Sequence, residues 1–135
     1  YNPVIAMLSY SNFGSSSHPM ANKVEDAVKF LRRSHPNMIV DGPIQSDFAL
    51  NKLMLTNKFE ESKLGNQKVN ILVFPNLDSA NITYKVIKEI DGAKSIGPII
   101  MGLDKAVHIL QLKPSVEEIV NMSAIAVIDA QSRNE

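Results

Sequence analysis

Short apolar runs alternate with amphipathic stretches along the chain, and this alternation predicts an α/β domain. The run at Val69–Phe74 is rich in β-branched residues, which is typical of a strand buried on both faces. Pro75 ends that strand because it has no amide hydrogen, and Asp78 is a predicted N-cap for a helix of residues 78–91. Ligands usually bind at the carboxyl ends of parallel strands, so residues 75–78 form a candidate ligand loop. An ordinary capped turn is the alternative.

Two earlier apolar runs, Val4–Tyr10 and Met38–Val40, are predicted strands that flank an amphipathic helix. The helix begins near Pro19, which suits a first turn, and ends before Pro36. Its predicted inner face recurs at helical spacing and consists of Met20, Val24, Ala27, Val28 and Leu31.

Polar loops follow both of these predicted strands. Ser11–Ser17 is rich in serine and could present amide and hydroxyl groups to an anion, although it carries neither of the usual phosphate-loop motifs. It could equally be a plain turn. Asp41, Gln45 and Asp47 could converge at the sheet edge as acceptors or metal ligands, but Asp-Gly-Pro is also an ordinary turn sequence.

The rest of the chain predicts a polar connection, two buried segments and a final helix. Residues 56–68 are either a surface connection or a mobile flap over the cleft, and a short helix of residues 49–54 precedes them. Residues 95–103 and 106–110 are apolar enough to be buried. Ser115 and Glu118 are spaced as a capping box for the last helix. The predicted inner face of that helix is Val116, Ile119, Val120, Ser123, Ala124 and Val127.

The composition of the chain argues against several classes of function. Fourteen basic and fourteen acidic side chains cancel, so no net field favours nucleic acid or a membrane surface. No apolar run reaches the roughly 20 residues that span a bilayer. Cysteine is absent, which excludes disulfides and fits a cytoplasmic location. The three histidines have no paired spacing, so no metal site is expected. We expect residues 1–135 to be one incomplete domain, cut from a longer chain.

Five ordered segments, spread from residue 7 to residue 131, resemble the phosphate acetyl/butyryl transferase family. They are MLSYSNFGSS (7–16), DGPIQSDFAL (41–50), FPNLDSANITYK (74–85), IGPIIMGLDKAVHIL (96–110) and SVEEIVNMSAIAVIDAQ (115–131). The resemblance implies a three-layer α/β sandwich like that of isocitrate and isopropylmalate dehydrogenases. The chain would correspond mainly to the smaller subdomain and the C-terminal helix.

The resemblance also implies that the transferase reaction is lost. Working members carry a serine and an arginine before the last helix and an aspartate one turn on, which assist attack of coenzyme A on acetyl phosphate. Gln111 and Leu112 stand at the serine and arginine positions, and Glu118 stands at the aspartate. A leucine cannot hold a phosphoryl group as arginine does. We therefore expect no catalytic residue here.

Such a loss resembles the family's branch at the C-terminus of bacterial hybrid malic enzymes. That branch implies a regulatory domain that senses acetyl-coenzyme A and assembles homo-oligomers. NADP (or NAD) and Mg²⁺ or Mn²⁺ would belong to the missing N-terminal region of the parent enzyme. The expected effector cleft consists of Ser11, Asn12, Gly14, Ser15, Asn76, Asp78, Asn81, Gly97, Pro98, Met101 and Gly102.

Two other readings stay open. The first is an active phosphate acetyltransferase that uses Glu118 as its carboxylate. The second is a scaffold that binds no ligand and is retained for assembly.

Overall fold

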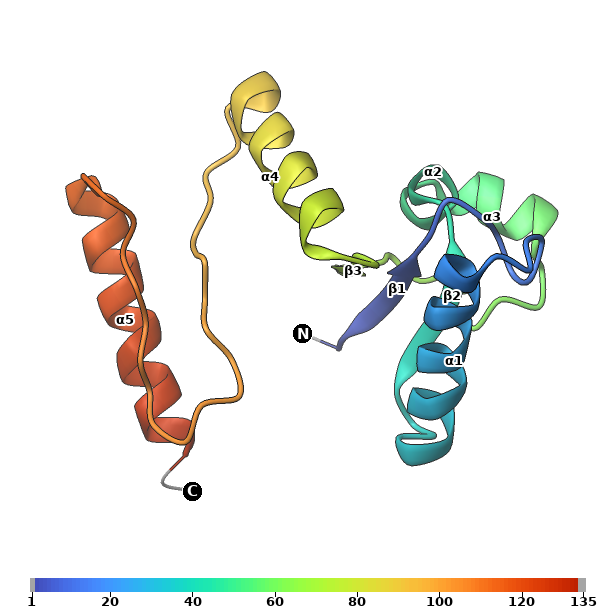
Figure 1. Ribbon diagram of the computed structural model, residues 1–135, viewed down its shortest axis with the longest axis horizontal. Helices are drawn as coiled ribbons and strands as arrows, with labels where there is room; N and C mark the ends of the chain where they lie inside the picture. Colours follow the sequence, from blue (N-terminus) through green and yellow to red (C-terminus); the bar gives the residue numbers. More distant parts are fainter. Residues whose placement is uncertain (1, 134–135) are drawn as a thin grey trace. The chain divides into compact units, whose positions relative to one another are not determined.

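The computed structural model describes residues 2–133, which form two compact units that divide after Lys85. The elements, labelled in Figure 1, are β1 (Val4–Leu8), α1 (Pro19–Ser34), β2 (Ile39–Ile44), α2 (Ser46–Leu50), α3 (Lys52–Lys58), β3 (Ile71–Val73), α4 (Leu77–Asp91) and α5 (Val116–Ser132). Strands alternate with helices in the first unit, as the apolar pattern predicts.

The first unit is built on a three-stranded parallel sheet in the order β2-β1-β3. β1 is therefore the central strand, and β3 is an edge strand among the described residues. Ile71 and Val73 in β3 are 40% and 38% exposed, so the prediction of a strand buried on both faces is wrong here. β3 pairs only with β1, and no described strand covers its other edge.

The pleat of β1 divides the core into two layers, because successive side chains of a strand point to opposite faces. Val4, Ala6 and Leu8 pack in one cluster with Ile44 and Phe48. Met7 packs on the other face with Val24 and Val28 of α1 and with Val40 of β2. The predicted inner face of α1 is confirmed for its central residues, whereas Met20 at the helix start is 41% exposed.

β2 is longer than the sequence predicts, because Asp41, Gly42 and Pro43 lie within the strand rather than in a turn. Gly42 has φ +144°, and the peptide bond between Gly42 and Pro43 is cis. A Cβ atom at Gly42 would lie 2.9 Å from Cβ of Met7 in β1, so the close approach of the strands requires glycine.

The carboxylate of Asp41 is buried and holds three parts of the first unit together. It accepts hydrogen bonds from the guanidinium of Arg32 in α1 and from the amide of Gly42 at 2.8 Å. It also accepts from the hydroxyl of Ser62 at 3.0 Å and the amide of Lys63 at 2.7 Å. Asp41 is therefore a structural residue. Each of its two carboxylate oxygens already accepts two hydrogen bonds, so neither is left to bind a ligand or metal.

Residues 56–68 are held against the first unit by the bonds from Ser62 and Lys63 to Asp41 and by apolar contacts. Their first residues belong to α3, Leu64 is fully buried, and Phe59 packs against Phe13 and Phe48. The segment is anchored on the core by Phe59 and Leu64, which favours a surface connection over a mobile flap. The predicted helix of residues 49–54 is in fact two short helices, α2 and α3.

The second unit contains the end of α4, an irregular segment of residues 93–115 and helix α5 (Figure 1). The prediction that residues 95–103 and 106–110 are buried is wrong in this structure, since Ile96, Met101 and Ile109 are each more than half exposed. No described strand lies beside them to pair their backbone. Among residues 2–133, no helix is long and apolar enough to cross a membrane.

Candidate functional site

A cleft of about 320 Å³ lies where β1 and β3 end, at the carboxyl edge of the sheet. This carboxyl-edge cleft is lined by Leu8, Ser9, Tyr10, Met20, Ser46, Phe74, Pro75, Asn76 and Ser79. Its volume falls within the range that suits a small-molecule ligand. The position agrees with the rule that ligands of open α/β sheets bind at the carboxyl ends of strands.

The electrostatics at the rim favour an anion. Helices α1 and α4 both begin beside the cleft, and Met20 and Ser79 lie in their first turns. Helix N-termini carry partial positive charge. Lys23 of α1 adds a positive charge next to the cleft, where its Nζ donates to the carbonyl oxygen of the lining residue Pro75 at 3.1 Å. The apolar floor and the positive rim together suit a ligand that has an anionic group at one end of an apolar chain.

Most of the polar side chains predicted for this cleft are used within the fold. Asn12 donates to Gln45 Oε1 at 2.8 Å and accepts from the Gln45 amide at 2.8 Å, which joins the β1 loop to the end of β2. Ser15 accepts from the amide of Asn12 at 3.0 Å. Ser11 is 5% exposed, and its hydroxyl lies 3.4 Å from that of Ser9. Gly14 has φ +79° and follows Phe13 in a tight turn.

Asn76 caps α4, and the predicted N-cap Asp78 lies inside the helix instead. The side-chain oxygen of Asn76 accepts from the amide of Ser79 at 2.9 Å. The interpretation of Asp78 as the cap is therefore wrong, because asparagine one position before the helix satisfies the orphan amide. Asp78 and Asn81 are exposed and do not line the cleft.

Gly97, Pro98, Met101 and Gly102 belong to the second unit, on the irregular segment. Gly97 has φ +138° and Gly102 has φ +82°, which are backbone conformations that glycine adopts readily. Whether these residues join Asn76 in one cleft stays a prediction.

Sequence reasoning missed most of the residues that line the carboxyl-edge cleft. Tyr10, Met20, Ser46, Phe74 and Ser79 line the cleft but were not among the expected cleft residues, although all except Met20 lie in segments that resemble the family. A usable signal was present for four of them, since Tyr10 and Phe74 end predicted strands and Met20 and Ser79 lie in the first turns of predicted helices, whereas Ser46 begins a helix only in the structure.

In the second unit, Glu118 is held by the predicted capping box, which is confirmed. Its carboxylate accepts from the amide of Ser115 at 2.7 Å, and the Ser115 hydroxyl accepts from the Glu118 amide at 3.2 Å. The Ser115 amide lowers the pKa of Glu118 below its ordinary value of 4.5, with Lys88 at 3.9 Å contributing. The carboxylate stabilises the helix start above that ordinary value, and this contribution is lost as the pH falls through the lowered pKa.

Gln111 and Glu118 both line a small cavity of about 20 Å³, which has room for about one water molecule. Leu112 is 98% exposed. Gln111, Glu118 and Leu112, which the resemblance places at the family's catalytic positions, therefore present one amide, one carboxylate engaged as a helix cap and one hydrocarbon side chain. Nothing in this set can hold a phosphoryl group bidentately.

Ser115→Ala is expected to destabilise the first turn of α5 by about 1 kcal/mol, because the Glu118 amide loses its acceptor. Glu118→Gln should cost less than Ser115→Ala at neutral pH, since glutamine also serves at this position of a capping box and only the contribution of the negative charge is lost. Chemical denaturation of both variants measures the difference. A large loss in Glu118→Gln would show that the negative charge has a further role.

The side chain of His108 is buried, and only one of its two ring nitrogens has a hydrogen-bond partner among the described residues. Its Nε2 lies 3.1 Å from Oδ2 of Asp129, while Nδ1 has no hydrogen-bond partner among the described residues. Arg133 donates to both carboxylate oxygens of Asp129 and also to the carbonyl oxygen of Leu103. Arg133, with His108 in a lesser role, lowers the pKa of Asp129. Among residues 2–133, no three histidine, aspartate or glutamate side chains gather as metal ligands.

Comparison with known proteins finds one family and two kinds of relative. The profile of the family described as "Phosphate acetyl/butaryl transferase" matches residues 1–127. The NADP-dependent malic enzyme of Escherichia coli is 38% identical over 132 residues, which are 97% of this chain and 17% of the enzyme. The phosphate acetyltransferase of Clostridium acetobutylicum is 39% identical over 129 residues, which are 96% of this chain and 38% of that protein.

Two solved structures are similar over nearly the whole chain. The EutD phosphotransacetylase from Staphylococcus aureus has a TM-score of 0.85 at 32% identity, and covers 98% of this chain with 40% of its own. A phosphotransacetylase from Streptococcus pyogenes has a TM-score of 0.86 at 33% identity, and covers 100% of this chain, again with 40% of its own. The chain thus spans less than half of these relatives and under a fifth of the malic enzyme.

Proposed function

Since the chain belongs to the phosphate acetyl/butyryl transferase family, we propose that it is a non-catalytic domain of a bacterial malic enzyme that senses acetyl-coenzyme A. The parent reaction would be the oxidative decarboxylation of malate with NADP. The observation that carries the proposal is the state of the three positions matching the catalytic residues. Gln111 and Leu112 lack the hydroxyl and the cation, and Glu118 is engaged as a helix cap. The NADP-dependent malic enzymes among the relatives support the choice of parent.

The carboxyl-edge cleft supports acetyl-coenzyme A as the effector. Its apolar floor, which includes Phe74 and Met20, suits the pantetheine arm and the acetyl group. Lys23 and the starts of α1 and α4 suit the phosphates. Binding of acetyl-coenzyme A in the cleft would change the rate of malate oxidation by the parent. The NADP and the divalent metal of that reaction would be bound by other residues of the parent.

Met20→Glu is expected to abolish the response of malate oxidation to acetyl-coenzyme A while leaving the unregulated rate. A carboxylate in the first turn of α1 is compatible with the helix dipole, so the fold should be retained, but it repels the anionic effector. The measurement is the malate-dependent reduction of NADP by the full-length protein across an acetyl-coenzyme A titration.

The matched control is Phe30→Glu, which places the same charge on α1 at a side chain that is 61% exposed and does not line the cleft. It should respond to acetyl-coenzyme A as the unmodified protein does. Equal responses from Met20→Glu and the unmodified protein would remove the carboxyl-edge cleft as the effector site.

The second candidate is an active phosphate acetyltransferase, which converts acetyl phosphate and coenzyme A to acetyl-coenzyme A and phosphate. The 39% identity to a phosphate acetyltransferase favours it, as does the retained carboxylate of Glu118. A parent protein of transferase length, without a malate-oxidising region, would favour this candidate, and the mass of the natural protein tells the two apart.

If the domain is instead a scaffold retained for assembly, it should not bind acetyl-coenzyme A. A ligand that binds only the native state must raise the melting temperature, so thermal unfolding with acetyl-coenzyme A separates a sensor from a scaffold.

Subunit contacts through this domain are also part of the proposal. They are supported by Leu50 and Leu53 of α2 and α3, which are 66% and 72% exposed.

A further inference from the structure

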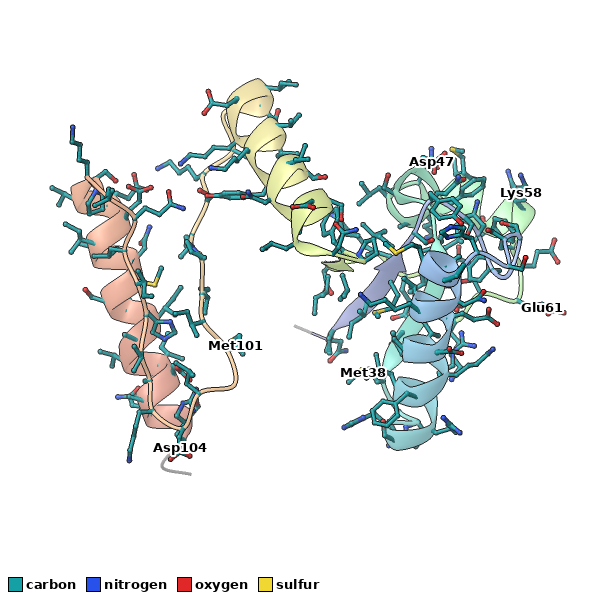
Figure 2. All side chains as sticks on the ribbon, viewed as in Figure 1. Met38, Asp47, Lys58, Glu61, Met101 and Asp104 are labelled. Carbon is teal, nitrogen blue, oxygen red and sulfur yellow. The ribbon has the colours of Figure 1, made fainter. Side chains whose placement is uncertain are left out.

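Lys23 connects helix α1 to the segment that begins α4. Its Nζ donates to the carbonyl oxygen of Pro75 at 3.1 Å, between residues 52 positions apart in the sequence. Figure 2 draws the side chains of both elements on the ribbon. The Pro75 oxygen belongs to the planar peptide group that joins Pro75 to Asn76, so the bond restrains the orientation of Asn76. We call this contact the Lys23–Pro75 link.

Asn76 organises the first turn of α4. Its side-chain oxygen accepts from the amide of Ser79 at 2.9 Å. Its carbonyl oxygen accepts from the Ser79 hydroxyl at 3.0 Å and from the Ala80 amide at 3.3 Å. The boundary between the two units, after Lys85, falls within α4. A restraint on Asn76 therefore acts on a helix to which both units contribute residues.

The link leaves the charge of Lys23 available at the rim of the carboxyl-edge cleft. Lys23 lies three positions after Met20, which lines the cleft, so the two share one side of α1. Lys29 of the same helix pairs with Glu25 at 2.7 Å, whereas no carboxylate forms a salt bridge with Lys23 among residues 2–133. A carbonyl oxygen holds an ammonium group in place without neutralising it, and an ammonium group has further N–H donors to offer.

We propose that Lys23 is a positioning residue that couples occupancy of the carboxyl-edge cleft to the start of α4. An anionic group of the ligand accepts from the remaining donors of Nζ, while the Pro75 carbonyl keeps its own bond. The ammonium group then bridges the ligand and the loop, so binding strengthens the restraint on Asn76. The inference rests on the proposed function, because it takes the same cleft as the effector site.

The link also prepares Lys23 for the ligand. A lysine side chain is long and flexible, and ordering it on binding costs conformational entropy. The Pro75 carbonyl holds Nζ at the rim before the ligand arrives, so part of that cost is met during folding. The same bond therefore favours binding and carries its effect to the first turn of α4.

The test measures hydrogen exchange in the peptide of residues 76–85 by mass spectrometry, in the full-length protein with and without acetyl-coenzyme A. Calorimetry sets the saturating concentration for each variant. In the unmodified protein the ligand should slow exchange about tenfold. Lys23→Met removes the charge and the donors, so exchange without ligand should be about threefold faster and the slowing at saturation should be lost. Lys23→Arg keeps a charged donor and should restore most of the slowing.

Lys29→Met is the matched control, because it removes the same charge from α1 at a residue that pairs with Glu25 and does not line the cleft. It should behave as the unmodified protein does. Pyrophosphate is a second probe that carries the anionic charge without a thioester. If acetyl-coenzyme A does not bind but pyrophosphate slows exchange through Lys23, the proposed effector is wrong and the coupling stands.

Three results would overturn the inference. Equal slowing at saturation in Lys23→Met and in the unmodified protein would show that occupancy reaches α4 without Lys23. An effect of Lys29→Met as large as that of Lys23→Met would assign the change to the charge of α1 as a whole. No slowing by either probe in the unmodified protein would show that the cleft and the start of α4 are not coupled.

Discussion

Replacing Gly42 with alanine should destabilise the chain by about 3 kcal/mol. Gly42 has φ +144°, a conformation that side chains rarely adopt. An added Cβ would also lie closer than 3.0 Å to the backbone carbonyl oxygen of Met7, and 2.9 Å from Met7 Cβ. Met7 lies in the central strand, so the backbone cannot move away without disturbing the pairing of β1 and β2. Urea denaturation monitored by circular dichroism measures the loss.

Gly14→Ala is the matched control for this substitution. Gly14 also has a positive φ, of +79°, but an added Cβ would meet nothing within 4 Å. The control therefore carries the conformational cost alone, about 1 kcal/mol. Equal losses in the two variants would show that the contact with Met7 is not what excludes a side chain at Gly42.

Replacing Asp41 with alanine should cost a similar amount, about 3 kcal/mol. The substitution leaves Arg32 without its carboxylate, and it removes the acceptor for the amides of Gly42 and Lys63 and for the hydroxyl of Ser62. These donors lie in or near the core, where an unmade hydrogen bond is expensive. Loss of the carboxylate should also release residues 59–64, which limited proteolysis would detect as new cleavage there.

Asp47→Ala removes an aspartate six positions away that is exposed in the first turn of α2. It should change the free energy of unfolding by less than about 1 kcal/mol, since only the helix dipole is affected. If Asp41→Ala were as mild as Asp47→Ala, the four hydrogen bonds of Asp41 would not be the link between α1, β2 and residues 62–63.

The sequence pattern predicted the elements of the first unit well, because their local signals agree with their packing. α1 begins at the predicted Pro19 and is capped by His18, and its Val24 and Val28 are buried against β1 and β2. Ser115 and Glu118 form the predicted capping box for the same reason, since all of its partners lie within four residues. Predictions of this kind need no knowledge of distant segments.

Predictions failed where a distant neighbour decides the outcome. Asp41-Gly42-Pro43 is an ordinary turn sequence, yet the long-range contacts of Asp41 with Arg32 and Ser62 hold it in a strand. Val120 and Ile96 are apolar and were predicted to be buried, yet they are 60% and 53% exposed, because burial is decided by neighbours distant in sequence and not by the residue type alone. The side chain of Asn12 was predicted for a ligand cleft, but it bonds to Gln45, which is distant in sequence. Asn76 was predicted for the same cleft, and it lines the carboxyl-edge cleft while also capping α4.

The central claim is that this domain recognises a thioester of coenzyme A without transferring its acyl group. The most direct test mixes the purified full-length protein with acetyl phosphate and coenzyme A and follows formation of the thioester bond by its ultraviolet absorbance. We predict no turnover above the uncatalysed rate, alongside saturable binding of acetyl-coenzyme A in a parallel calorimetric titration. Sustained thioester formation that disappears in a Gln111→Ala, Glu118→Ala double variant would contradict the claim.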